Sequence, residues 1–116
     1  MFVKVKSAAL IGLTGYIVDV EVDTHKGLPG QSIVGLPDTA VKESRDRVKA
    51  AISNSGLEFP PGYFTINLAP ADTKKEGPVY DLPIAVGILA SHKIIKTGLL
   101  EKTIFIGELS LDGAVR

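Results

Sequence analysis

The sequence contains no cysteine and no tryptophan, and aromatic residues make up only 6% of its 116 residues. The lack of cysteine excludes a disulfide framework, a thiolate nucleophile and a zinc site built on Cys ligands. A chain of this kind suits the reducing cytoplasm, where we expect the protein to be located. Its most apolar run, Leu82 to Ala90, is far shorter than the roughly 20 residues of a membrane-spanning helix, so no membrane partner is expected.

The sequence also lacks an excess of charge of either sign. Thirteen Lys and Arg residues balance thirteen Asp and Glu residues, and the formal net charge is zero. The total therefore does not indicate a strongly basic nucleic-acid binder, although a local patch stays possible. With 45% hydrophobic residues, the composition is that of an ordinary globular protein, and we expect residues 1–116 to form one domain.

The first part of the chain alternates between apolar and polar residues. Residues 2–10, "FVKVKSAAL", and residues 16–23, "YIVDVEVD", both have the period of two that is typical of strands. Gly12 and Gly15 mark a turn between them, so the pattern predicts a β-hairpin. Its valines face the core, and its acidic residues face solvent. These acidic residues are Asp19, Glu21 and Asp23.

The remainder of the chain predicts two helices and further strands. A short strand over 31–35 precedes a helix that starts at Asp38 as N-cap and stops at Gly56. A strand over 63–69 precedes a second helix, with Asp81 as N-cap and almost no polar side, which we expect to be buried. Residues 103–111 predict another strand, and residues 111–115, "LDGAV", predict a hairpin turn.

This order of elements predicts the α+β class: a two-layer domain with a mixed β-sheet and helices packed on one face. No G-x-G-x-x-G motif follows a strand, which makes a dinucleotide-binding fold less suitable. The second arm of the last hairpin has only three residues, Ala114, Val115 and Arg116. We therefore expect the domain to be a piece of a longer protein.

The candidates for catalysis are weak. No serine lies in a G-x-S-x-G motif, and His25 and His92 have no carboxylate at ligand spacing. Surface or helix-end positions suit both histidines better than a catalytic pair with serine. Asp19, Glu21 and Asp23 have similar, solvated environments, whereas acid-base catalysis needs carboxylates in unlike environments. A solvated sheet face is therefore favoured over a cation site. No catalytic or metal-ligating residue is predicted.

Five basic residues are the candidates for binding. Three occupy one side of the first predicted helix, and two occupy the loop before the second, near its N-terminus: Lys42, Arg45, Lys49, Lys74 and Lys75. They could form a patch for nucleic acid or for a neighbouring subunit. Alternatively, nearby acidic residues neutralise them as surface ion pairs. These acidic residues are Glu43, Asp46 and Glu76.

Three segments resemble a known family. Residues 27–56, "GLPGQSIVGLPDTAVKESRDRVKAAISNSG", 66–89, "INLAPADTKKEGPVYDLPIAVGIL", and 105–116, "FIGELSLDGAVR", are similar to the N-terminal domain of the YifB/ComM family of magnesium-chelatase-like AAA+ ATPases. The resemblance implies the ribosomal-protein-domain-2-like fold, shared with Lon-type protease domains and the RadA C-terminal domain. It also implies a downstream module that binds ATP and Mg, a hexameric ring, and action on DNA in recombination and competence, with branch migration as the activity.

The same resemblance bears on the loop at residues 75–81, "KEGPVYD". In Lon-type proteases the matching loop reads K-D-G-P-S-A-G, and its serine is the nucleophile. Here Val79 occupies that serine position, so the resemblance implies a non-catalytic accessory domain without a cofactor of its own, in which Tyr80 and Asp81 cap or pack the helix. Two alternatives remain: a divergent enzyme of the Lon-type peptidase or small-molecule kinase fold, and a chelatase ATPase subunit that inserts a metal into porphyrin.

Overall fold

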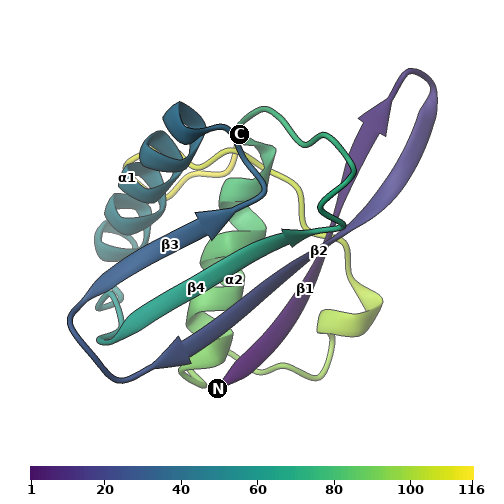
Figure 1. The fold of residues 1–116 in the computed structure, drawn as a ribbon. Helices are drawn as coiled ribbons and strands as arrows, with labels where there is room; N and C mark the ends of the chain where they lie inside the picture. Colours follow the sequence, from purple (N-terminus) through teal and green to yellow (C-terminus); the bar gives the residue numbers. More distant parts are fainter.

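The computed structural model describes residues 1–116, which form one sheet and two helices joined by turns (Figure 1). The strands are β1 (Phe2–Ile11), β2 (Thr14–His25), β3 (Gly30–Val34) and β4 (Tyr63–Ala69). The helices are α1 (Asp38–Asn54) and α2 (Asp81–Ser91), with single 3₁₀ turns η1 (Pro78–Tyr80) and η2 (Leu100–Lys102). The α+β class is confirmed.

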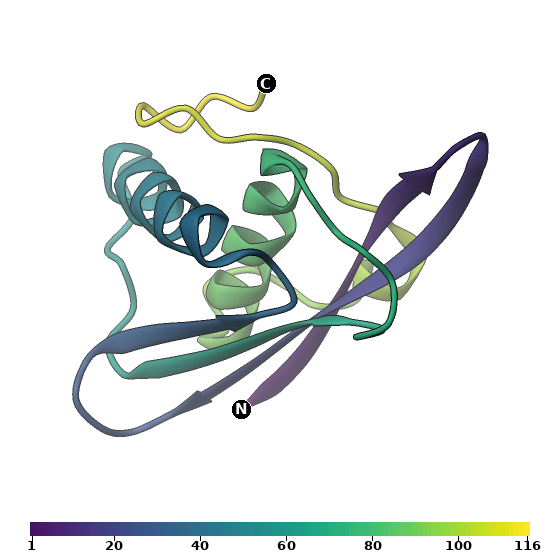
Figure 2. The same cartoon turned by 45° about the horizontal axis from the view of Figure 1, so that its top comes forward.

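The four strands form a mixed sheet in the order β1-β2-β4-β3. β2 is antiparallel to both β1 and β4, whereas β3 and β4 run parallel. The parallel pair requires a crossover, which α1 supplies. Figure 2 shows both helices on the same side of the sheet, so the predicted two-layer arrangement is also confirmed.

The predicted alternation places the core on the helix-covered face of the sheet. Val18, Val20 and Val22 of β2 are fully buried. Their neighbours on the opposite face remain in contact with solvent, and Glu21 accepts a hydrogen bond of 2.8 Å from Asn67 Nδ2 on β4. The acidic residues of β2 therefore line a solvated sheet face, as predicted.

Helix α2 packs against β1, β2 and α1. Eight of its eleven residues are buried, as its apolar sequence predicts. A Cβ atom added at Gly87 would lie only 2.5 Å from Val22 Cγ2, so glycine allows α2 to approach β2 this closely. Neither helix has the length and apolar character that crossing a membrane requires.

The predicted N-caps were wrong by one residue in both helices. The helices begin at Asp38 and Asp81 themselves, the N-cap positions belong to Pro37 and Tyr80, and neither helix has a side-chain cap. The carboxylate of Asp81 is instead bonded to groups from α1 and from the C-terminal segment. The hydrogen bonds that these donors make to the carboxylate are stronger than those that the free amides of its own helix would make.

The predicted strand over 103–111 was also wrong. Only isolated bridges occur there, one between Ile104 and Lys6 and one between Leu109 and Val115. The reason is that Gly107 bonds to η1 and to the start of α2. Its N–H donates to Val79 O at 2.8 Å, and its carbonyl accepts from Leu82 N at 3.0 Å. The hairpin turn that follows is present, closed by a bond of 2.9 Å from Ser110 N to Ala114 O.

Candidate functional site

A groove of about 640 Å³ runs between the β1–β2 hairpin and the loop that precedes α2. Small and apolar side chains contribute most of its wall, together with one ion pair from the loop. Its lining includes Ala8, Leu10, Ile11, Lys74, Glu76 and Val79. Val79 is half-buried there and offers only carbon atoms, so this side chain cannot act as a nucleophile.

The two lysines of this loop point in different directions. Lys74 is exposed and forms an ion pair of 3.8 Å with Glu76. Lys75 is only 3% exposed, and its ammonium donates to the main-chain carbonyl of Pro70. Lys75 therefore stabilises the loop from inside, and its charge does not join that of Lys74 at the surface.

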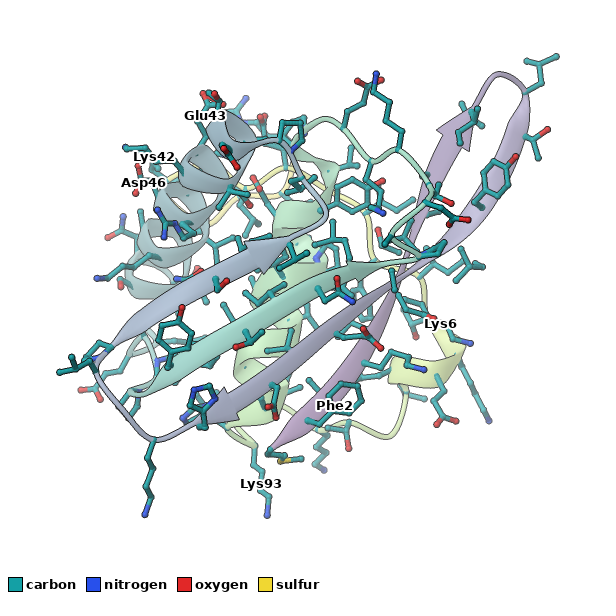
Figure 3. All side chains as sticks on the ribbon, viewed as in Figure 1. Phe2, Lys6, Lys42, Glu43, Asp46 and Lys93 are labelled. Carbon is teal, nitrogen blue, oxygen red and sulfur yellow. The ribbon has the colours of Figure 1, made fainter.

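The three candidate binding residues on α1, Lys42, Arg45 and Lys49, have local partners. Lys42 forms an exposed ion pair of 3.1 Å with Asp46, and Figure 3 shows both on the outer side of α1 with Glu43. Arg45 donates to the main-chain carbonyl of Gln31 at 3.2 Å. Exposed Lys49 lies 6.0 Å from the centre of the Phe59 ring, within the range of a cation–π contact. Ion pairing, the alternative to a free basic patch, is thus present at Lys42 and Lys74.

A buried polar cluster connects α1, α2 and the C-terminal segment. Asp81 is fully buried and accepts from Arg47 Nε at 2.6 Å, from Ser44 Oγ at 2.7 Å and from Leu109 N at 3.1 Å. The hydrogen bond to Asp81 raises the pKa of the Arg47 guanidinium above its ordinary value. All of these bonds are used within the fold, so the cluster is structural.

Sequence reasoning missed this cluster because Arg47 and Asp81 lie 34 residues apart in the chain. The signal was present in the helical period. Ser44, Arg47 and Ala51 share one side of α1 with buried Val48, so the guanidinium had to find a partner next to the core.

A serine and a histidine do come together at the end of α2. Ser91 Oγ lies 3.5 Å from His92 Nδ1, but the serine hydroxyl donates to Ile88 O at 2.8 Å and accepts from Thr24 Oγ1 at 2.7 Å. Because its single proton is directed to a helix carbonyl, Ser91 is not activated by His92. Nowhere do three His, Asp or Glu side chains converge as they would around a metal ion.

The fold and the groove together define a two-layer α+β domain, with one solvated sheet face and with a groove beside the loop that precedes α2. Comparison with known proteins assigns the family. Residues 20–116 match the family model described as "Subunit ChlI of Mg-chelatase". The chain is 51% identical to YifB of Escherichia coli over 112 residues and 52% identical to YifB of Salmonella typhimurium. It is 44% identical to competence protein ComM of Haemophilus influenzae.

Each of these three alignments covers 97% of this chain and 22% of the relative. The chain belongs to the magnesium-chelatase-like YifB/ComM family. It spans about a fifth of the length of the curated relatives that it matches.

Proposed function

We propose that this chain is a non-catalytic accessory domain of a magnesium-chelatase-like AAA+ ATPase, and that it makes contacts that assemble the ATPase ring. The observation that carries the proposal is the wall of the groove. Val79 takes the place where the resemblance to Lon-type proteases puts a nucleophile, and the buried polar groups nearby are used to hold the fold together.

The remaining parts of the proposal concern the whole protein. Family membership supports an ATPase module that binds ATP and Mg in a part of the protein outside this chain, and a cytoplasmic hexamer. The name of one relative, competence protein ComM, supports a role in competence. DNA uptake and recombination are what the family resemblance adds to this proposal. In that setting, the domain would serve a motor that moves branched DNA.

The exposed side of α1 is the proposed contact surface. Lys42 and Lys49 alternate there with Glu43 and Asp46, and Lys74 and Glu76 repeat this mixture in the loop. Mixed charges suit a complementary protein surface better than a phosphate backbone, which favours one sign of charge. Contact between subunits is therefore favoured over direct DNA binding, with Arg45 holding α1 to β3 and Lys75 holding the loop.

Charge reversal in the full-length protein tests this proposal. The variant Lys42→Glu, Lys49→Glu and Lys74→Glu should weaken ring assembly with ATP and Mg by about tenfold or more, equivalent to about 1.4 kcal/mol. Sedimentation velocity measures the assembly, and fluorescence anisotropy with branched DNA measures binding.

A control variant has the same change in charge at exposed lysines elsewhere, Lys26→Glu, Lys96→Glu and Lys102→Glu. Loss of DNA affinity with intact rings would assign the surface to DNA instead. If both properties match those of the control, the contact surface is not on α1.

The peptidase and kinase alternatives have no observation in their favour. A peptidase would need a nucleophile where Val79 lies, and a small-molecule kinase would need a phosphate loop richer in glycine than residues 74–81. A chelatase role is supported only by the description of the matching family. Labelling of the purified chain by a serine-reactive phosphonate, or copurification of a porphyrin, would reverse this order.

A further inference from the structure

We infer that the free edge of β1 binds an extended, apolar peptide segment as an added strand, in the groove between the hairpin and the loop at residues 70–77. This site is separate from the charged side of α1, and it stands whether or not that side assembles a ring. It would give the domain a second partner, recognised by its main chain and by alternate apolar side chains.

The edge of β1 is paired at one position and unpaired beyond it. Phe105 N donates to Lys6 O at 2.8 Å, so the main-chain groups of Lys6 point away from β2. Directions alternate along an antiparallel strand, and the groups of Ala8 and Leu10 therefore point the same way. No hydrogen bond within the chain reaches the outward groups of these two residues. They remain available as donors and acceptors.

The unpaired edge borders the groove rather than open solvent alone. Ala8, Leu10 and Ile11 line it from the hairpin, which projects beyond the rest of the molecule in Figure 1. Leu10 is 73% exposed and Ile106, which also lines the groove, is 50% exposed. Exposed apolar side chains gathered beside unpaired main-chain groups are typical of a surface that is covered by a partner.

The other edge of the sheet, formed by β3, is protected, whereas the edge of β1 is open. β3 has only five residues, and Arg45 donates to the carbonyl of Gln31 on that strand. By contrast, β1 pairs with β2 in one unbroken register, and residues 7–11, "SAALI", include no proline, charge or bulge. Proteins usually block exposed edges with such features, and here one edge is blocked while the other is left open.

A single extended segment fits this site better than a second copy of the chain. Ile104 already forms an isolated parallel bridge with Lys6, and a peptide at Ala8 and Leu10 would continue pairing along that edge. Lys74 and Glu76 line the opposite side of the groove, so the incoming chain is bounded on both sides. The free edge from Ala8 to Ile11 matches about 13 Å of extended peptide. Its alternate side chains would face the apolar wall.

Peptide selection on the 116-residue chain tests this inference. The probe is a phage-displayed library of random peptides of about eight residues. Enriched peptides are synthesised with a fluorophore, and anisotropy gives their affinity for the chain and for three variants. Ala8→Pro removes one outward donor without touching the bonds to β2, and Leu10→Lys adds a charge to the groove. Leu111→Lys is the matched control, because Leu111 is 57% exposed and lies outside the groove.

The expected result is enrichment of peptides with alternating apolar residues. Their affinity should fall by about tenfold or more in Ala8→Pro and Leu10→Lys, and stay unchanged in Leu111→Lys. Thermal unfolding of each variant shows that the loss is not a loss of fold.

Three results would overturn the inference. The first is that no peptide is enriched on the natural chain relative to Ala8→Pro. The second is that the enriched peptides bind all variants equally. The third is a concentration-dependent dimer of the chain that Ala8→Pro abolishes. The last result would assign the edge to a second copy.

Discussion

At the scale of single residues, the carboxylate of Asp81 is the point where three segments of the chain meet. Asp81 is the first residue of α2. Its carboxylate accepts hydrogen bonds from Arg47 and Ser44 of α1 and from the main-chain N–H of Leu109. Removal of one member of a buried ion pair leaves the other without a partner in a poorly solvated place.

We predict that Asp81→Ala lowers the free energy of unfolding by about 3–5 kcal/mol, the cost of breaking a buried pair. Asp46→Ala is the matched control, since its pair with Lys42 is exposed and is worth at most about 1 kcal/mol. Urea denaturation of the chain measures both. A loss in Asp81→Ala no larger than that of the control would show that the cluster does not hold the segments together.

The phenol of Tyr80 provides a second residue-scale prediction. Burial raises the pKa of Tyr80 above its ordinary value of 10.0. The unfolded chain therefore loses this proton at lower pH than the folded chain does. The contribution to stability is complete below about pH 10 and is lost as pH rises through the raised pKa of the folded state.

Unfolding free energies of the natural chain and Tyr80→Phe, measured in urea between pH 8 and 11, check this. The advantage of the natural chain over the variant should shrink above about pH 10. Other titrating groups are common to the two proteins and cancel in the difference. A difference that stays constant with pH would contradict the buried state of this phenol.

At the scale of elements, the contact between α2 and β2 depends on Gly87. Alanine would favour the helix by about 1 kcal/mol, but its Cβ would lie 2.5 Å from Val22 Cγ2. Overpacking of this kind costs about 1–3 kcal/mol, so we predict that Gly87→Ala lowers the free energy of unfolding by up to about 2 kcal/mol in net terms.

A double-mutant cycle with Val22→Ala identifies the cause of that loss. The added methyl group should be tolerated once the Val22 side chain is shortened, so the two changes should couple by about 1 kcal/mol or more. Thermal or urea unfolding of the four proteins gives the coupling. Additive effects would mean that the helix approach is set by other contacts.

Elements with a strong period were predicted correctly, and elements that depend on distant partners were not. In β1 and β2 the alternating valines are enough to predict the strand and its buried face. In α2 the continuous apolar residues are enough to predict a buried helix. Residues 103–111 have the composition of a strand, but the turn before α2 provides partners for Gly107, and Asp81 provides one for Leu109. Composition cannot show which partners a segment will meet.

At the scale of the whole molecule, the arrangement leaves distinct surfaces for different uses. Both helices lie on one face of the sheet, the acidic residues of β2 lie on the other, and the hairpin extends the molecule to 38 × 26 × 24 Å. The charged side of α1 and the open edge of β1 belong to different elements. The variants proposed for each surface can therefore be tested independently on full-length protein and on this chain.

The sequence by itself determined the class of fold, the buried faces, the lack of a nucleophile at Val79 and the membership in the family. These features depend on local period, composition and motif order, which are written along the chain. Only the tertiary structure decided that Lys75 turns inward, that Arg47 bonds to Asp81, and that the edge of β1 stays open beside a groove. Each of these depends on groups far apart in the chain, and their proximity is set by packing of the helical layer on the sheet.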